Sequence, residues 1–565
     1  MRSVLAEAEA NYKEGNHIRV MQLLQPLRQA GETLEPASLI RLAVSLTKLQ
    51  QFKGALEIFL SLDEPDVSRR LVFLKMALNI ANKLDDSAQV VSIARSVLAL
   101  EPTCKDARVF YRHHIRRTFD YAEIRKSDRE TLEAIQRDDA LAIECELLHD
   151  HIMWCGDERI NFKIRGQKGL FYDDTSRRLR RNLPHSTGDR IRVGYFSSDL
   201  SENHATLCLL NRAFDLHDPA RFDIRIYDLS PEEYVDLSQG FRRRHGNRIH
   251  RIADLATDHA LEIVRSHRLD IAIDLKGHTD NQRGELFNRG LAPVQAAYLG
   301  FPGSGVGIDC DYIIADRHVC PPGSEACFEE KFCWLPESYQ VNDNHYRPVV
   351  QPLTKRDLGL PEDRIVFMSA NNPKKISFET LGLWLRVLDA VPGSLLWMVS
   401  YPEVATQSIR AFFLENGVEP ERLVFVPAIP VAQHLARLGA GDLGLDSFPC
   451  NGHTTTSDKL WAGLPVVTRR GRNFSSRVSE SLLNAVHLGE LVAEDDDAFV
   501  ALCASLAADP ERLRALKSHL ITGRHSLPLF NTERTVRHLE DAFATMVERS
   551  KSGMAPEHFA VPPRA

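Results

Sequence analysis

The sequence lacks the features that mark a membrane protein or a secreted protein. No apolar run approaches the roughly 20 residues that a membrane-spanning helix needs. The first nine residues include Glu7 and Glu9, where a signal peptide would need an apolar core. The 10 cysteines form no CxxC pair and show no spacing typical of a disulfide framework, which a chain of 565 residues does not need. We therefore expect a reducing, cytoplasmic location and no membrane span.

The chain also lacks an excess of positive charge and a recognisable metal site. Its formal net charge of −7 argues against nucleic acid as the main partner. His318, Cys320, Cys327 and Cys333 are irregularly spaced, so buried thiols are a better interpretation than zinc ligands. The acidic run at 494–497 is expected to begin a solvent-facing helix. We expect no metal.

The first part of the chain is helical and repetitive. Apolar residues recur 35 positions apart on one predicted helix face, as Val20, Leu24 and Leu27, then Ala55, Phe59 and Leu62, then Val90, Ala94 and Val97. This period resembles that of tetratricopeptide repeats, although Gly15 is replaced by Gln50 and Asp85 in the later copies. We assign the repeats to residues 1–115; a non-repeating helical bundle is the alternative. Either arrangement offers a groove for a polypeptide.

Residues 116–188 are expected to form a helical extension and a basic linker. Four arginines lie within 176–181, and a solvated face is the preferred interpretation over a site for an acidic partner.

From residue 189 onwards, short apolar strands alternate with helical segments. The predicted strands are Ile191–Ser197, Phe222–Tyr227, Ile271–Leu275, Gln295–Leu299, Tyr312–Ala315, Ile365–Ser369, Leu395–Val399, Leu423–Val426, Leu443–Leu445 and Pro465–Thr468. The alternation predicts an α/β fold with two doubly wound parallel sheets, over 189–345 and 346–548. Residues 342–355 are the expected linker, and 549–565 the expected disordered tail. Ligands should bind between the sheets, at the carboxyl ends of the strands.

The segment Cys450–Asp458 is the most informative of the strand-to-helix connections. It follows an apolar strand and opens a predicted helix with His453 and three threonines, at the end where the helix dipole favours an anion. Asp458 lies one turn further along and can accept hydrogen bonds from sugar hydroxyls. Lys375 precedes a second predicted helix that begins near Ser377. Together these groups suggest a clamp for a nucleoside diphosphate; an ordinary threonine-capped helix is the alternative.

These segments resemble the O-GlcNAc transferase family, glycosyltransferase family 41, over residues 190–525. That family includes SPINDLY-type fucosyltransferases and bacterial protein N-glucosyltransferases. The matching segments are SSDLSENHAT from Ser197, DLKGHTDNQRGELFNRGLAPVQAAYLGFPGSGVGIDCDYIIAD from Asp274, IVFMSANNPKKIS from Ile365 and CNGHTTTSDKLWAGLPVVT from Cys450. The resemblance implies the GT-B fold, in which two Rossmann-like domains face each other across a cleft.

The resemblance also implies roles at the donor site. Lys375 would hold the donor diphosphate and stabilise its charge as it departs, and Asp458 would bind the ribose. The remaining implied donor contacts are His453, Thr454 and Thr455 at the phosphates, His434 near the uracil, and Cys450 beside the sugar. Asn372 stands where O-GlcNAc transferases usually have glutamine, so its phosphate contact is shorter in reach.

On the acceptor side, the resemblance points to a histidine and a loop. His204 corresponds to a histidine proposed as the catalytic base, and a base and a positioning group remain equal alternatives for it. Cys208 stands where animal relatives have a second histidine. His278, Pro302 and Gly303 belong to a possible sugar or acceptor loop, in which a satisfied loop histidine is the expected role of His278.

The resemblance implies metal-independent, inverting transfer of a sugar from a UDP-sugar to a protein, without a cofactor. GlcNAc transfer from UDP-GlcNAc to Ser or Thr hydroxyls is the leading hypothesis, with the helical N-terminal domain recruiting the acceptor. One alternative is a protein N-glucosyltransferase that uses UDP-glucose on Asn. Another is a non-catalytic scaffold that senses a nucleotide sugar. A UDP-sugar epimerase on the same fold would leave the helical N-terminal part unexplained.

Overall fold

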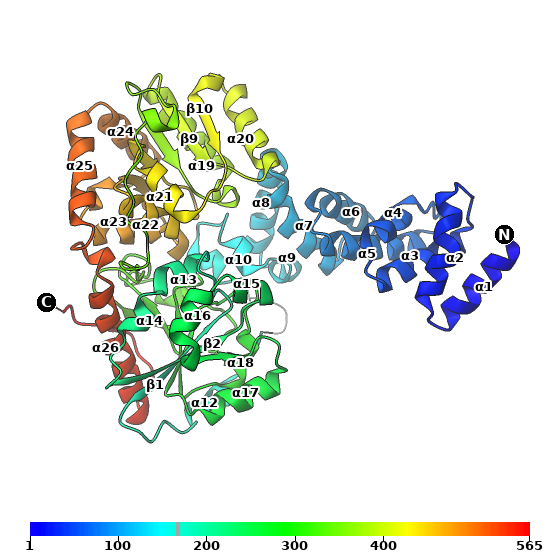
Figure 1. Ribbon diagram of the computed structural model, residues 1–565, viewed down its shortest axis with the longest axis horizontal. Coiled ribbons are helices and arrows are strands. Elements are labelled where there is room, and N and C mark those ends of the chain that lie inside the picture. Colours follow the sequence, from blue (N-terminus) through cyan, green and yellow to red (C-terminus); the bar gives the residue numbers. More distant parts are fainter. Residues whose placement is uncertain (165–169, 565) are drawn as a thin grey trace. The chain divides into compact units, whose positions relative to one another are not determined.

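The computed structural model describes residues 1–164 and 170–564, and the chain divides into two compact units, 1–146 and 147–565 (Figure 1). The first unit is entirely helical, and the second contains both predicted sheets. Within the described residues, no helix combines the length and the apolarity needed to cross a membrane.

The first unit is built from consecutive helix pairs. Its helices are α1 (Arg2–Lys13), α2 (His17–Gln29), α3 (Pro36–Lys48), α4 (Phe52–Ser61), α5 (Val67–Lys83), α6 (Ser87–Leu100), α7 (Lys105–Thr118), α8 (Tyr121–Gln136) and α9 (Ala140–Glu144). The predicted inner face is confirmed for Val20, Ala55, Val90 and Ala94, which are fully buried.

A left-handed residue closes the turn inside each of four helix pairs. These residues are Gly15, Gln50, Asp85 and Phe119, with φ angles of 77°, 58°, 52° and 54°. Their near-regular spacing supports a repeat over a non-repeating bundle, and it reveals a fourth pair, α7 with α8, that the sequence did not predict. The predicted boundary at 115 therefore falls inside α7 and is wrong. Glycine is the usual residue in this conformation, and Phe119 in its place made the fourth copy unrecognisable from the sequence.

The second unit contains two all-parallel sheets. The first has the strand order β14-β7-β6-β5-β4-β1-β2-β3, and the second has the order β10-β9-β8-β11-β12-β13. The strands are β1 (Ile191–Ser197), β2 (Phe222–Asp228), β3 (Ile249–Arg251), β4 (Ile271–Asp274), β5 (Val294–Tyr298), β6 (Tyr312–Ala315), β7 (Lys331–Trp334), β8 (Val366–Ser369), β9 (Leu395–Val399), β10 (Leu423–Val426), β11 (Leu443–Leu445), β12 (Val466–Arg469), β13 (Val492–Ala493) and β14 (Phe559–Ala560). All ten predicted strands are confirmed to within one residue. Four short strands were missed, namely β3, β7, β13 and β14.

Helices connect and cover these strands. They are α10 (Leu148–His151), α11 (Glu158–Asn161), α12 (Asp174–Arg181), α13 (Ala205–Leu210), α14 (Ala213–Leu216), α15 (Glu232–Asp236), α16 (Gln239–His245), α17 (Thr257–Ser266), α18 (Gly284–Arg289), α19 (Phe378–Ala390), α20 (Glu403–Glu415), α21 (Val431–Leu438), α22 (Thr454–Trp461), α23 (Val478–Ala485), α24 (Asp496–Ala507), α25 (Pro510–Gly523) and α26 (Thr532–Lys551). The helix predicted at the acidic run is α24, which Asp495 caps.

The linker predicted over 342–355 does connect the two sheets, but its first part is packed rather than solvated. Asn342 and Asp343 are buried, and so is Arg347. Arg347 donates from Nη1 to Asn342 Oδ1 at 2.9 Å, and this hydrogen bond joins two residues within the linker.

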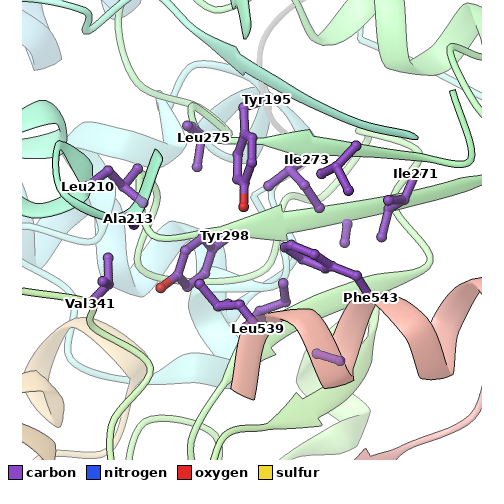
Figure 2. Packing of buried hydrophobic residues seen from close by; sticks show 14 of the residues in the cluster. Tyr195, Leu210, Ala213, Ile271, Ile273, Leu275, Tyr298, Val341, Leu539 and Phe543 are labelled. Carbon is purple, nitrogen blue, oxygen red and sulfur yellow. The ribbon is translucent and has the colours of Figure 1, made fainter. Parts of the chain in front are cut away.

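The C-terminal segment returns to the first sheet, which corrects two predictions. Leu539 and Phe543 of α26 pack among Tyr195, Tyr298 and neighbouring strand residues of the first sheet (Figure 2). The helix predicted to end the second domain, 346–548, therefore completes the core of the first. In the tail predicted over 549–565, the described residues up to 564 are not disordered, because β14 adds in parallel to the edge of β7. Pairing with a distant strand leaves no signal in so short a segment.

The basic segment 176–181 is not a solvated linker. It lies in α12, where Arg180 is only 2% exposed. Arg180 donates from Nε to Asp309 Oδ2 at 2.8 Å and from Nη1 to Asp311 Oδ2 at 2.7 Å. Arg177 and Arg181 reach the same two carboxylates. The arginines therefore fasten α12 to the loop that precedes β6.

We expect Arg180→Met to destabilise the protein by about 3 kcal/mol, because it leaves two buried carboxylates without their main partner. Arg178→Met is the matched control, since Arg178 is an exposed residue of the same helix. Chemical unfolding of the full chain measures both. Equal stability of the two variants would contradict this account.

Candidate active site

A cavity of about 440 Å³ lies in the second unit, at the carboxyl ends of strands from both sheets. Its first wall comes from the loops after β1 and β4, with Asp199, His204 and Lys276. Its second wall comes from the loop after β8 and the start of α22, with Lys375 and His453. Parallel strands bring these loops together, as expected for a ligand site between the sheets.

Six of the predicted site residues line this cavity and six do not. Those that line it are Lys375, His204, Asn372, His453, Thr454 and Thr455. Those outside its lining are His434, Cys450, Asp458, His278, Pro302 and Gly303. The exposed Asn372 accepts a hydrogen bond from the backbone N–H of Lys374 through its side-chain oxygen.

The second wall carries positive charge that no carboxylate neutralises. Lys375 Nζ donates to the Asn451 carbonyl at 2.8 Å and forms no ion pair with a carboxylate in the described part of the chain. Burial, together with Lys375, lowers the pKa of His453 well below its usual range, so the ring is neutral. Thr454 and Thr455 open α22, and the first N–H groups of a helix have no intrahelical acceptors. This arrangement suits an anion.

Asp458 lies one turn into α22 and is held by the interdomain linker. Arg347 Nη2 is 3.1 Å from Asp458 Oδ1. Burial raises the pKa of Asp458 and outweighs the opposing effect of Arg347. The carboxylate therefore has a fixed charged partner and retains one oxygen for another donor.

His434 and Cys450 are both outside the cavity lining, His434 partly exposed and Cys450 buried. His434 Nδ1 accepts from Arg437 Nε at 3.1 Å, and burial lowers the pKa of His434 to about 4. Cys450 is fully buried, and burial raises the pKa of its thiol. Both groups are therefore uncharged at neutral pH.

In the predicted sugar or acceptor loop of His278, Pro302 and Gly303, the contacts of His278 are with the protein itself. His278 is buried and donates from Nε2 to the Val306 carbonyl at 2.9 Å. Its ring packs against Phe301 with a centroid separation of 5.3 Å, and burial lowers the pKa of His278 to about 4. These contacts agree with the expected loop histidine, but only at Nε2, because the buried Nδ1 has no hydrogen-bond partner among the described residues.

His204 caps the helix α13. Its Nδ1 accepts from the Thr206 backbone N–H at 3.3 Å, and its Nε2 lies 3.5 Å from Asp199 Oδ1. A neutral ring in this arrangement carries its proton on Nε2, because Nδ1 must offer its lone pair. A base needs an unprotonated nitrogen facing the acceptor, so this hydrogen bond favours the positioning role.

The residues at or beside the site that the sequence predictions missed include Asp199, His149, Lys276 and Lys459. His149 lines the cavity, although its segment was assigned to the helical extension. Asp199 and Lys276 also line it, from the loops that contain His204 and His278. Lys459 lies fully buried in α22, one residue after Asp458. The local sequence around His149 gives no sign of a site. Lys459, by contrast, could have been recognised, because a lysine is rarely found on the buried face of a helix.

Two parallel sheets with a cavity between the loops at the carboxyl ends of their strands have the arrangement of the GT-B glycosyltransferase fold. The chain belongs to glycosyltransferase family 41, whose sequence model matches residues 174–356 and 346–539. The chain is 32% identical over 378 residues to a probable UDP-N-acetylglucosamine–peptide N-acetylglucosaminyltransferase, SEC, of Arabidopsis thaliana, covering 66% of this chain and 38% of the relative. It is 26% identical over 523 residues to the UDP-N-acetylglucosamine–peptide N-acetylglucosaminyltransferase of Caenorhabditis elegans, covering 72% of this chain and 44% of the relative.

The chain thus spans less than half the length of these relatives. Among solved structures, a variant of the Thermobaculum terrenum O-GlcNAc transferase superposes with a TM-score of 0.68, at 23% identity, over 92% of this chain and 99% of that one. This likeness shows the shared fold.

Lys459 generates a prediction about stability. Its Nζ has one long contact, 3.4 Å to the Leu445 carbonyl, and burial lowers the pKa of Lys459 to about 8. Because this lies below the lysine pKa of the unfolded chain, holding the charge at pH 7 costs the folded state about 3 kcal/mol. We therefore expect Lys459→Met to raise the midpoint of thermal unfolding at pH 7. The difference in midpoint between the variant and the wild type should become smaller as the pH rises from about 8 to 10, because Lys459 of the folded wild-type protein loses its proton in this range.

Lys517→Met is the matched control, because Lys517 is another largely buried lysine but donates to two carbonyls, Gly439 at 3.0 Å and Gly441 at 2.6 Å. It should lower the midpoint. A Lys459→Met variant that is less stable than the wild type at pH 7 would contradict the conclusion that the buried charge of Lys459 destabilises the folded state.

Proposed function

We propose that the chain is an inverting, metal-independent protein glycosyltransferase that transfers GlcNAc from UDP-GlcNAc to Ser or Thr hydroxyls of acceptor proteins. The observation that carries the proposal is Lys375, an ammonium group without a carboxylate partner beside the start of α22. Membership of family 41 and the activities named for the two relatives support the donor and the type of acceptor.

In this proposal the protein itself stabilises the departing UDP. Negative charge develops on the diphosphate as the bond to the sugar breaks. Lys375 and the free N–H groups of Thr454 and Thr455 would neutralise that charge without reorganising, which is worth several kcal/mol for well-placed donors. His453 is neutral and its Nε2 already donates to the Ser475 carbonyl, so its contribution to the diphosphate would come from its backbone N–H.

The rest of the donor would extend from the diphosphate along α22. Asp458, held by Arg347, would accept from the ribose hydroxyls. The uncharged His434 would lie beside the uracil, and the buried Cys450 would contribute to the wall around the sugar.

The acceptor would be recruited by the helical unit, because stacked helix pairs present an extended surface suited to a polypeptide. The cytoplasmic location remains the prediction made from the cysteine pattern.

Titration calorimetry with UDP-GlcNAc, UDP-glucose and GDP-fucose tests the donor. We expect UDP-GlcNAc to bind most tightly, and intact-mass spectrometry of host proteins to show additions of one N-acetylhexosamine on Ser or Thr. Preference for UDP-glucose with modified Asn would establish an N-glucosyltransferase instead. Slow release of UDP with no modified protein would indicate a non-catalytic scaffold.

Replacing the donor lysine should damage turnover more than replacing the acceptor-side histidine. We expect Lys375→Ala to lower kcat at saturating donor by about 10²–10³-fold, since it removes a charge that acts on the leaving group. His204→Ala should lower kcat by less. Lys374→Ala, an exposed neighbour, is the control. A Lys375→Ala enzyme that binds donor weakly but turns over normally at saturation would refute this role.

A further inference from the structure

Three charged or titratable side chains form a chain of contacts on the first wall of the cavity. Lys276 Nζ donates to Asp199 Oδ1 at 2.5 Å, and His204 Nε2 lies 3.5 Å from the same oxygen. The other oxygen, Asp199 Oδ2, accepts from Thr206 Oγ1 at 3.3 Å. Asp199 is 5% exposed and Lys276 is 3% exposed, so little solvent screens the contacts. The loops after β1 and β4 are thereby joined through one carboxylate.

The helix cap requires a neutral His204. The Nδ1 lone pair accepts the Thr206 N–H, and protonation would place an N–H on both ring nitrogens. Two donors would then face each other at the start of α13, and the cap would be lost. Any role of His204 as a base also requires the neutral ring, so both roles depend on the same protonation state.

Asp199 and Lys276 act on this ring in opposite directions. Burial lowers the pKa of His204, Asp199 raises it, and Lys276 lowers it. An unpaired carboxylate at 3.5 Å would favour the imidazolium strongly. The ion pair with Lys276 removes most of that influence while keeping the carboxylate in place as an acceptor.

Other titratable groups face the same space but do not contact the ring nitrogens. Tyr234 of α15 is the nearest ring, with its centroid 6.3 Å from that of His204. On the same loop, Glu202 is turned away and accepts from the Phe241 N–H. Cys208 donates to the Glu202 carbonyl, and burial raises the pKa of its thiol to about 11. The other titratable residues that line the cavity are His149, Asp280, Tyr339, Lys375 and His453.

We propose that Lys276 is a positioning residue that keeps His204 neutral by neutralising Asp199, and thereby holds the acceptor-side wall in its capped form. The kinetic consequence rests on the proposed transferase function, whereas the protonation state of His204 does not. Lys276 acts through Asp199, so replacing either partner should move the titration of His204 in opposite directions.

Nuclear magnetic resonance titration of the histidine rings in the full-length protein tests the proposal without an activity assay. His204→Asn identifies the signal of His204. We expect Lys276→Met to move the His204 midpoint upwards by roughly one pH unit or more, because Asp199 is left unpaired. Asp199→Asn should move it downwards. Asp280→Asn, which removes a cavity carboxylate that does not contact the ring, should leave the midpoint unchanged.

Two further variants separate tuning from general damage to the fold. Lys276→Arg keeps the charge and should restore a midpoint close to that of the wild type. The double variant Lys276→Met with Asp199→Asn should lie close to the wild type as well, because the two effects cancel. Midpoints that move in the same direction in both single variants, or that do not move, would overturn the proposal.

The acid limb of kcat/KM supplies the functional readout. We expect it to shift to higher pH in Lys276→Met and to lower pH in Asp199→Asn, following the His204 midpoints. If no transfer is detected in any variant, the proposed function fails while the titration result stands. If transfer is detected but the acid limb of kcat/KM does not shift with the His204 midpoint, the positioning role of Lys276 is wrong.

Discussion

Positive charge that lacks a carboxylate partner at the edge of the second sheet is the interaction on which the site depends. The loop after β8 and the start of α22 meet because parallel strands end at one edge. Lys375 then lies beside free helix N–H groups, and its ammonium contacts the Asn451 carbonyl and the Cys450 thiol but no carboxylate among the described residues. An ammonium group and free N–H groups at a helix start together favour the binding of an anion. The proposed donor diphosphate would supply that anion.

The opposite wall follows a different rule, because its charges are paired and each pair sets a geometry. Asp199 joins two loops of this wall through Lys276 and Thr206. On the donor side, Asp458 of α22 is paired in the same way with Arg347 of the linker. Buried ion pairs add little net stability when compared with apolar packing, but removing one partner of such a pair is strongly destabilising. Lys459, buried on the donor side with a single long contact, lacks such a partner and lowers the stability of the folded state.

The sequence predicted the site best where one short segment contains the whole signal. The segment Cys450–Asp458 carries its hydroxyls, imidazole and carboxylate within nine residues, so the spacing alone predicted the start of α22 and proposed it as the anion-binding end. His204 was located by its motif, but its hydrogen bond to Thr206 and its distance from Asp199 required coordinates. His149 was missed because its segment precedes the first strand and joins the cavity only through packing.

The sequence by itself determined the period of the helical repeats and ten of the fourteen strands found in the described part of the chain, because both follow from the local spacing of apolar residues. Only the tertiary structure decided where distant segments pair. It placed α26 on the first sheet, added β14 to β7, and turned Arg180 from an apparent linker residue into the buried partner of Asp309 and Asp311. These contacts join residues more than a hundred positions apart, and their partners are chosen by burial and charge that local sequence does not encode.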